Sequence, residues 1–156
     1  MRISKYLKEE FCVMELKAED KNSAIEEIAQ LLKKSKELTN AQAFLDDVFK
    51  REELSSTGIG DGVAIPHGRT DAVREFIIGF GRSKDGLDFN SLDGEKVHLV
   101  FLMGASNKDL NLYLRLLAEL SRLIINGKFR QDMMNAQSPK EVCDLVLQYE
   151  GMRNTR

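Results

Sequence analysis

The sequence predicts an α/β fold, a layered sandwich in which a mixed β-sheet is flanked by α-helices. Two observations predict it. Apolar runs of strand length are interleaved with segments of helical periodicity. The 156 residues also have an ordinary globular composition, with 42% hydrophobic and 31% charged residues. No repeat or proline-rich linker divides the chain, so we expect one domain over residues 1–150, followed by a polar tail at residues 151–156 that frays.

The first half of the chain is expected to begin with a strand at residues 11–16, followed by two helices. Asp20 is a suitable N-cap for the first helix, because its carboxylate can accept hydrogen bonds from the free amides of the first turn. Thr39 and Gln42 form a capping-box pattern. The second helix is therefore predicted to begin at Thr39.

Three apolar runs in the middle of the chain predict further strands, at residues 63–65, 76–81 and 97–103. The last of them is continuously apolar, as expected for a central strand that is covered on both faces. Between the second and third runs, residues 87–95 are typical of a loop, which ends in the turn pair Asp93-Gly94.

Two more helices are expected in the second half of the chain. Ser106 and Asp109 form a capping-box pattern ahead of a leucine-rich helix, which is predicted to end near residue 126 at an Asn-Gly pair. The last helix has the clearest beginning. Ser138 is the cap, a proline follows as the first helical residue, and Glu141 completes the capping box.

The segment with the clearest chemical content is at residues 56–68, which read Ser-Thr-Gly-Ile-Gly-Asp-Gly-Val-Ala-Ile-Pro-His-Gly. Gly58, Gly60 and Gly62 allow the backbone to bend without a side-chain clash. Such a loop can direct amide N–H groups at an anion. Glycine-rich loops are also often simple turns, so the glycines alone do not identify a site.

His67 is the candidate reactive group of this segment. Pro66 restricts the backbone just before it, and Gly68 leaves space after it. An imidazole with a pKa near ~6.5 is largely neutral at cell pH, and its free nitrogen lone pair can act as a covalent nucleophile. Phosphoryl transfer to such a nitrogen mainly requires positioning and charge stabilisation. The alternative is a histidine at the end of a loop that is hydrogen-bonded to the backbone.

The run from Thr57 to Gly68 is similar to the signature of the type-2 IIA domain of the bacterial phosphoenolpyruvate:sugar phosphotransferase system, the mannitol, fructose and nitrogen-regulatory branch. The resemblance covers nearly the whole chain. Further matches are Arg51-Glu52, Asp20-Lys21, Ala24-Ile25, and the strand at residues 97–103 with the leucine-rich helix after it.

The resemblance implies an α/β sandwich with a single phosphohistidine, no metal and no organic cofactor, and a small phosphohistidine carrier protein as donor. The family's phosphorylated histidine falls on His67. Its motif arginine falls on Arg51, which can donate charge-assisted hydrogen bonds to phosphoryl oxygens. An exposed charge at a helix end is the alternative for Arg51. The loop expected to hold the phosphoryl group consists of Thr57, Gly58, Gly60, Gly62 and Gly68.

One position departs from the family pattern. Many members carry a second histidine just before the helix run Leu-Arg-Leu-Leu, where this chain has Tyr113. A tyrosine hydroxyl can donate a hydrogen bond to a phosphoryl oxygen, but it cannot share a proton near neutral pH as an imidazole does. The departure affects how fast the chain transfers the group and how the charge on phosphorylated His67 is balanced.

The other polar candidates are assigned structural roles. His98 lies within an apolar strand, and we expect it to be satisfied by hydrogen bonds and to lie outside the site. Asp61 and Asp71 flank the motif, but carboxylates repel a phosphoryl group, so we interpret them as turn and cap residues. A metal hydrolase that uses His67 and His98 is disfavoured, because the sequence has no local cluster of histidine and carboxylate ligands.

Composition also limits the partners and the location. Cys12 and Cys143 lie far apart in apolar stretches, and we expect two buried thiols in a reducing compartment. The net charge of −2 provides no basic field for nucleic acid. The sequence contains no apolar stretch long enough for a signal peptide at the N-terminus or for a membrane span. We expect a cytoplasmic protein without direct membrane insertion.

Two functions follow from the resemblance. In the first, which we prefer narrowly, the chain is a stand-alone regulatory domain of the nitrogen type, and phosphorylation of His67 changes which target protein it binds. In the second, it is the IIA component of a mannitol- or fructose-type sugar uptake system and passes the group to a IIB domain. Tyr113 and the absence of a fused IIB domain favour the first function.

Overall fold

The computed structural model describes residues 2–152, whose strands form one mixed β-sheet. Within these residues the strands are β1 (Cys12–Val13), β2 (Gly58–Gly60), β3 (Val63–Ala64), β4 (His67–Arg69), β5 (Phe76–Leu87) and β6 (Val97–Ala105). Their order is β1-β5-β6-β3-β2, and β4 pairs with β6 beyond the end of β3. Both parallel and antiparallel pairs occur, which confirms the predicted mixed sheet.

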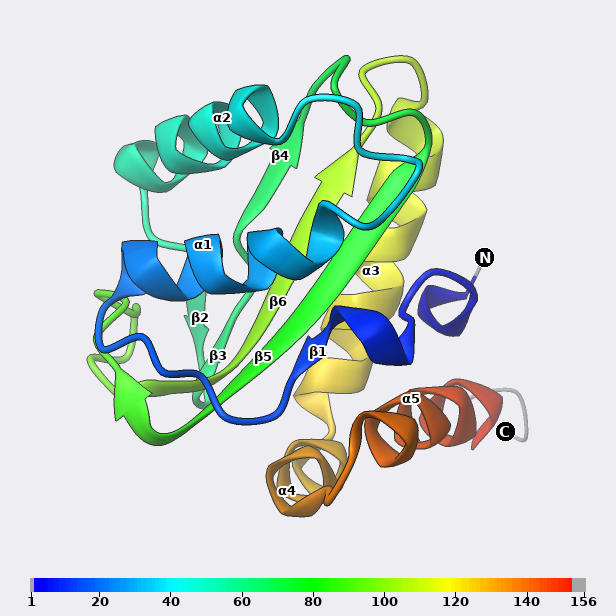
Figure 1. Cartoon of the computed structure of the whole chain (residues 1–156). Coiled ribbons are helices and arrows are strands. Elements are labelled where there is room, and N and C mark those ends of the chain that lie inside the picture. The colour runs from blue at the N-terminus through cyan, green and yellow to red at the C-terminus, as the bar shows by residue number, and fades with distance from the viewer. Residues whose placement is uncertain (1, 153–156) are drawn as a thin grey trace.

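Helices cover both faces of this sheet (Figure 1). They are α1 (Lys21–Leu32), α2 (Ala41–Leu54), α3 (Leu110–Ile125), α4 (Gly127–Asn135) and α5 (Pro139–Met152), with short 3-10 helices η1 (Ile3–Lys5) and η2 (Glu9–Phe11) near the N-terminus. Helices α1 and α2 lie on one face, and α3 lies on the other (Figure 1). The predicted α/β fold is therefore confirmed. In the described part of the chain, no helix combines the length and apolar character needed to cross a membrane.

Two apolar cores result, one on each face of the sheet. Side chains of β6 alternate between them, so that Phe101 and Met103 join α3, α4 and α5, whereas Val100 and Leu102 join α1 and α2. Gly79 and Gly81 of β5 allow α1 to approach closely, because a Cβ atom at Gly79 would lie 2.6 Å from Ile28. Both faces of the sheet are thus covered by apolar cores, so a functional site is expected at the edges of the sheet or at the strand ends.

Local capping signals placed some helix ends correctly. The carboxylate of Asp20 accepts a hydrogen bond from the backbone N–H of Ser23 at 2.8 Å, and the hydroxyl of Ser138 accepts one from the N–H of Glu141 at 3.1 Å. Both caps had been predicted. Helix α5 continues to Met152, two residues into the segment that we expected to fray, and residues 153–156 lie outside the described part.

Two predicted capping boxes are corrected. Thr39 is not the cap of α2, because its hydroxyl donates to the carbonyl of Ala72 at 3.0 Å, and Asn40 caps the helix instead. Ser106 does not open α3. Its hydroxyl accepts from Lys108 N–H in a local turn, and Asp109 is the cap. In both cases the side chain that the capping pattern predicted as the cap makes a different hydrogen bond.

The expected strand at residues 11–16 and the strand at residues 76–81 also differ from the structure. Strand β1 has only two residues, because Phe11 belongs to η2, while β5 continues to Leu87 across an irregular stretch of its pairing with β6. The strand expected at residues 63–65 is β3, which ends one residue earlier. Helix α4 was missed. Asn126 both follows α3 and caps α4, so the predicted helix end is also a helix start.

Candidate functional site

His67 begins strand β4, which runs parallel to β6 in a register that places His67 beside Met103. The carbonyl of Pro66 accepts the backbone N–H of Met103 at 3.0 Å, so the residue before His67 is fixed to the central strand. His67 thereby shares the α3 side of the sheet with Met103, and Gly68 takes the opposite side.

The imidazole of His67 is held in a defined orientation. Its Nδ1 lies 2.9 Å from the carbonyl oxygen of Ile65, and because a carbonyl only accepts, Nδ1 carries the proton. The lone pair is then on Nε2. The half-buried ring has a pKa below its ordinary value of 6.5, first because burial disfavours the charged form and also because of the positive charge of Arg51. A neutral ring with a free Nε2 is the reactive form of a histidine nucleophile.

Tyr113, in the first turn of α3, lies against this imidazole. The ring centroids of His67 and Tyr113 are 5.8 Å apart, with 42° between the planes. Burial raises the pKa of the Tyr113 phenol, although the charges of Arg51 and Arg69 act in the opposite direction. The hydroxyl therefore keeps its proton at neutral pH and is available as a hydrogen-bond donor.

Arg51 lies in the last turn of α2 and brings a positive charge to the same place. Its guanidinium Nη1 donates to the carbonyl of Ser55 at 2.9 Å, which links it to the backbone just beyond the helix. Its charge acts on both His67 and Tyr113. The structure thus brings together three residues that the sequence had singled out.

Arg69 was missed at the sequence level. It lies two residues after His67 on β4, so both side chains project from the same side of the strand, and its charge acts on Tyr113. The backbone N–H of Arg69 donates to Asp47 Oδ2 at 2.8 Å, which ties this end of β4 to α2. Strand β4 has only three residues and no apolar alternation, so no pattern in the sequence could have found Arg69.

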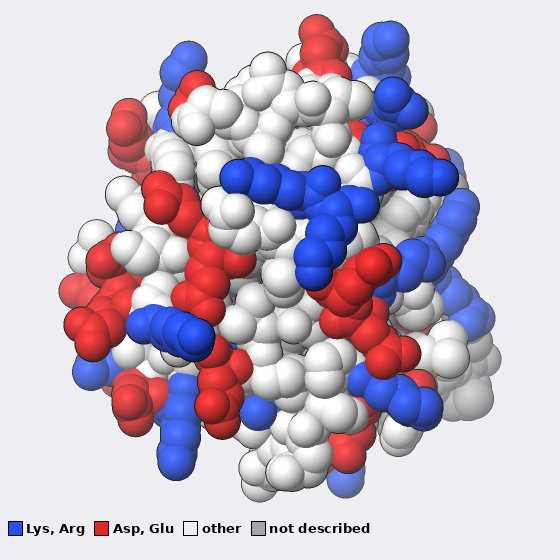
Figure 2. Space-filling model, viewed as in Figure 1, with Lys and Arg blue, Asp and Glu red and all other residues white. Residues whose placement is uncertain are grey.

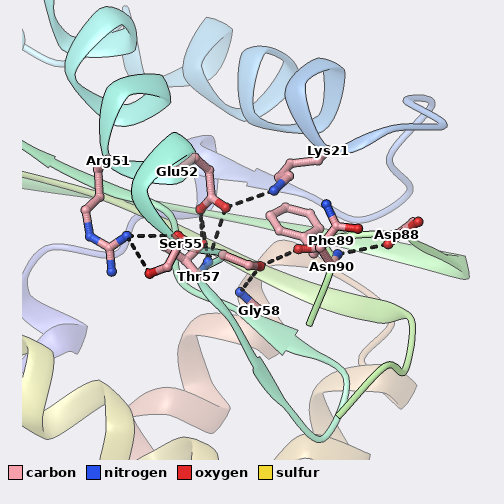
Figure 3. Close-up of polar contacts among 10 residues, drawn as sticks. Lys21, Arg51, Glu52, Ser55, Thr57, Gly58, Asp88, Phe89 and Asn90 are labelled. Atoms are coloured by element: carbon pink, nitrogen blue, oxygen red, sulfur yellow. Dashed lines mark hydrogen bonds and ion pairs between the residues drawn. The ribbon is translucent and has the colours of Figure 1, made fainter. Parts of the chain in front are cut away.

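A buried carboxylate anchors the backbone between Arg51 and the strands (Figure 3). Glu52 is only 7% exposed, and both of its oxygens accept from the N–H of Thr57 at 3.2 Å. The Thr57 hydroxyl also donates to Glu52, and Lys21 Nζ of α1 lies 3.1 Å from Glu52 Oε2. Glu52 therefore fixes the turn that follows α2 and carries Ser55, to which Arg51 is hydrogen-bonded.

Thr57 and Gly68 were expected to hold the phosphoryl group, and both make other contacts. The N–H and the hydroxyl of Thr57 are engaged by Glu52, and its carbonyl accepts from Ile65 N–H at 3.0 Å. Gly68 faces α2, where an added Cβ would lie 2.9 Å from Asp47 Oδ2. These two residues position the segment that leads to His67, and both donors of Thr57 are already bound to Glu52.

Three further glycines of the expected phosphate loop lie away from His67. Gly58 packs against Ser91, and Gly60 and Gly62 form a tight turn with φ values of +103° and +78°. The carbonyl of Gly62 accepts from Leu99 N–H at 3.0 Å. Leu99 precedes Met103, the partner of His67, by four residues, which is about 13 Å along β6. Because of this separation, the structure does not bring the glycine turn to the histidine.

The remaining candidates lie apart from the site. His98 is half-buried, and its Nδ1 donates to the carbonyl of Ser83 at 2.9 Å, which confirms that it is satisfied by a hydrogen bond. It precedes Met103 by five residues, about 16 Å along the strand, so it cannot share a ligand with His67. Asp61 lies in the glycine turn. Among residues 2–152, no group of three or more His, Cys, Asp or Glu side chains is arranged to hold a metal ion.

The surface carries charges of both signs. Figure 2 shows Lys and Arg side chains interspersed with Asp and Glu side chains over the face it displays. A nucleic-acid interface is typically a continuous basic surface. The face shown carries a mixture of both charges, and the whole chain has a net charge of −2.

Comparisons with known proteins show which family and which fold the chain is similar to. A family model described as "Phosphoenolpyruvate-dependent sugar phosphotransferase system, EIIA 2" matches residues 5–149. The PTS system fructose-specific EIIABC component of Bacillus subtilis (strain 168) is 37% identical over 150 residues, which make up 96% of this chain and 24% of that protein. The chain therefore spans about a quarter of the length of this relative.

Solved structures share the fold. The nitrogen regulatory protein IIA-Ntr from Neisseria meningitidis has a TM-score of 0.86 and 29% sequence identity, covering 92% of this chain and 98% of that one. Enzyme IIAMTL from Escherichia coli, in complex with phosphorylated enzyme IIBMTL, has a TM-score of 0.78 and 22% identity, covering 91% of this chain and 97% of that one. The second likeness concerns the fold alone.

Proposed function

We propose that this chain, which belongs to the EIIA 2 family of the phosphoenolpyruvate-dependent sugar phosphotransferase system, carries a phosphoryl group on Nε2 of His67. IIA domains of this system are phosphoryl-transfer carriers. The observation that carries the proposal for this residue is the bond between His67 Nδ1 and the Ile65 carbonyl, which leaves the Nε2 lone pair free beside Arg51 and Tyr113. We place the transfer in the cytoplasm.

The proposed step is an in-line transfer between two imidazoles. The Nε2 lone pair of His67 attacks the phosphorus of a phosphohistidine on a small carrier protein, the N–P bond to the donor breaks, and the donor nitrogen regains its electron pair. His67 becomes positively charged in this step, and its Nδ1–H remains hydrogen-bonded to the Ile65 carbonyl, which stabilises that charge. The pKa of His67 supports the step, because the free ring is neutral.

Two arginines and one tyrosine are proposed to stabilise the phosphoryl oxygens. Arg51 and Arg69 supply positive charge, and an N–H donor bound to a charged acceptor forms a stronger hydrogen bond than a neutral pair does. Tyr113 supplies a hydroxyl donor that stays protonated. Because Tyr113 cannot take up a proton as an imidazole would, we expect slower turnover than with a second histidine at this position.

For the use of the phosphoryl group we propose the regulatory role, in which phosphorylation of His67 changes binding to a target protein. The observation that favours it is the Tyr113 ring at 5.8 Å from His67, because slow turnover suits a carrier whose phosphorylation state is read by a partner. A doubly charged phosphoryl group next to two arginines alters the local surface enough to control an interface.

A second candidate is transfer to a IIB domain in sugar uptake. It is favoured by the fructose-specific relative, which aligns over 96% of this chain, and by a structural neighbour that was solved with a phosphorylated IIB enzyme. The two roles differ in rate. An uptake component must transfer its phosphoryl group to a cognate IIB domain as fast as the sugar is consumed, whereas a regulator need only hold it.

The carrier chemistry is tested by intact-protein mass spectrometry after incubation with phosphoenolpyruvate and the two general proteins of the system. We expect one acid-labile phosphoryl group on the wild type and on His98→Gln, and none on His67→Gln. A phosphoryl group that persists on His67→Gln would overturn the proposal. Affinity capture with the phosphorylated and unphosphorylated wild type then separates the two roles, since identical partners for both forms would exclude the regulatory one.

A further inference from the structure

Two cysteines that lie 131 positions apart in the sequence (143 minus 12) meet in the fold. Cys12 is in β1 and Cys143 is in α5, and the two side chains lie near enough to affect each other's pKa. The sulfur of Cys12 donates to the Lys8 carbonyl at 3.5 Å, and the sulfur of Cys143 donates to the Leu7 carbonyl at 3.6 Å. Both thiols therefore lie over two consecutive peptide groups of the segment between η1 and η2.

The segments that carry the two thiols are fixed to each other. Glu150, in the last turn of α5, accepts the backbone N–H of Ile3 at 2.5 Å and that of Ser4 at 3.2 Å. Both cysteines also pack against the apolar core formed by β5, β6, α3, α4 and α5. Because these contacts set the register of α5 against the N-terminal segment, the two sulfur atoms are held close without a covalent bond.

The two thiols differ in reactivity. The pKa of Cys143 is lowered, chiefly by its interaction with the Cys12 side chain, with Lys8 contributing in the same direction and burial, Glu9 and Asp144 opposing it. The pKa of Cys12 is raised by the same interaction and by burial. Both side chains are only partly buried. Since the thiolate is the nucleophile in thiol–disulfide exchange, Cys143 is the attacking group and Cys12 the resolving one.

We propose that Cys12 and Cys143 form a thiol modification site, which reacts with a small-molecule disulfide of the glutathione type to give an intramolecular disulfide that joins β1 to α5. In the first step the Cys143 thiolate attacks one sulfur of the reagent, forms a mixed disulfide and releases one reagent thiol. In the second step Cys12 loses its proton and attacks Cys143 Sγ, which releases the second reagent thiol. The protein dithiol is oxidised and the reagent disulfide is reduced to two thiols.

This bond would enclose most of the chain in one covalent loop. Cross-links that close long loops restrict the unfolded chain most, so the oxidised protein should be more stable than the reduced one. The site is separate from the proposed phosphoryl carrier. Neither cysteine contributes to the surroundings of His67, where Arg51, Tyr113 and Arg69 lie.

The test uses the purified full chain in equal concentrations of reduced and oxidised glutathione, followed by alkylation of the remaining thiols and peptide mass spectrometry. We expect one cross-linked peptide pair that contains Cys12 and Cys143, a monomeric protein, and a rise in Tm of about 5–10 °C relative to the reduced chain. Cys12→Ser should instead hold a stable glutathione adduct on Cys143, because the resolving thiol is missing.

Three results would overturn the proposal. They are alkylation of both cysteines in the wild type after oxidation, glutathione adducts on both cysteines without the cross-link, or disulfide-linked dimers in place of the internal bond. Cys12→Ser and Cys143→Ser also serve as matched controls for the thermal measurement. Neither variant should show the oxidation-dependent rise in Tm, even if its reduced form is less stable than the wild type.

Discussion

His67 and His98 make the same hydrogen bond in different surroundings. In each residue Nδ1 donates to a backbone carbonyl at 2.9 Å. The acceptor is the carbonyl of Ile65 for His67 and the carbonyl of Ser83 for His98. Each ring is half-buried, and each therefore keeps a lone pair on Nε2. By tautomer and burial alone, either histidine would qualify as a nucleophile.

Their neighbours differ. Beside His67 lie the Tyr113 ring and the charge of Arg51. A Cβ added at Gly86 would be 3.1 Å from the Cε1 atom of His98. The ring of His98 also lines a pocket with Arg130, but Arg130 is paired there with the carboxylate of Asp61 at 4.0 Å, which would repel a phosphoryl group. The difference teaches that the fixed tautomer is common, whereas positive charge and hydroxyl donors gathered around the ring are what suit it to phosphoryl transfer.

The largest expected effect comes from removing the charge that distinguishes the two histidines. Arg51→Ala should slow phosphorylation of His67 about 100-fold, because losing a charged donor from a developing phosphoryl charge costs about 2–3 kcal/mol. The measurement is the rate of phosphoryl incorporation at fixed donor concentration. Arg122→Ala, in the last turn of α3 and exposed, is the matched control and should transfer normally. Equal rates for the two variants would remove Arg51 from the site.

The next largest effect is expected at Glu52, which fixes the turn that follows Arg51. Glu52→Gln replaces the buried carboxylate that binds Thr57 and Lys21, so we expect a loss of about 2 kcal/mol in the free energy of unfolding and about a tenfold slower transfer. Urea unfolding and the incorporation assay measure the two effects. The exposed neighbour provides the control, because Glu53→Gln should change neither. Unchanged stability in Glu52→Gln would contradict the anchoring role.

A smaller effect is expected at Tyr113. Tyr113→Phe removes one neutral donor worth about 1 kcal/mol, so transfer should slow about fivefold, and Tyr113→His should transfer faster than the wild type. Tyr149→Phe is the control, since the Tyr149 hydroxyl donates to Asp132 and lies outside the site. If Tyr113→Phe transferred at the wild-type rate, the hydroxyl would have no part in binding the phosphoryl group.

The smallest effect is a change in pH dependence. Because burial and Arg51 lower the pKa of His67, its ring stays neutral and reactive at pH values somewhat below 6.5, and acceptor activity falls only when pH drops through the lowered pKa. Arg51→Gln removes one of these causes, so the pKa should rise and the acid limb should move to higher pH. An NMR titration of the His67 ring checks this, with Arg122→Gln as reference, and a shift to lower pH would contradict the assignment.

The lowered pKa of His67 also makes the stability of the fold depend on pH. The folded chain holds His67 more weakly protonated than the unfolded chain does, so the unfolded state binds more protons as pH falls through 6.5. The contribution of this group to stability is therefore present above pH 6.5 and is lost below it. Replacement by Gln should remove that part of the pH dependence of urea unfolding.

The sequence predicted the parts of the fold that depend on short-range contacts. The caps at Asp20 and Ser138 were predicted because each is satisfied within three residues. The cap predicted at Thr39 was wrong, because its hydroxyl donates to the carbonyl of Ala72, which lies 33 residues away. Helix α4 was missed because its apolar side is narrow, with Phe129 and Met133 as its buried residues.

The candidate site was predicted only in part. His67 was singled out by the chemistry of its segment and by the resemblance, whereas Arg51 and Tyr113 came from the resemblance alone, and the structure brings these residues together. Arg69 was missed because its place depends on how β4 pairs with β6, which periodicity does not reveal. The glycine turn was expected to bind the phosphoryl group because the sequence does not reveal the register of the strands. In the structure, that register places the turn near Leu99 instead.

The most direct test of the account is proton–nitrogen correlation NMR of the histidine rings, recorded before and after phosphorylation by the general proteins. Before phosphorylation, both rings should carry their proton on Nδ1. Afterwards, Nε2 of His67 should show the bond to phosphorus while the signals of His98 stay unchanged. Phosphorylation of His67 on Nδ1, or any phosphorylation of His98, would contradict the claim that the fixed tautomer and its charged neighbours together select the reactive nitrogen.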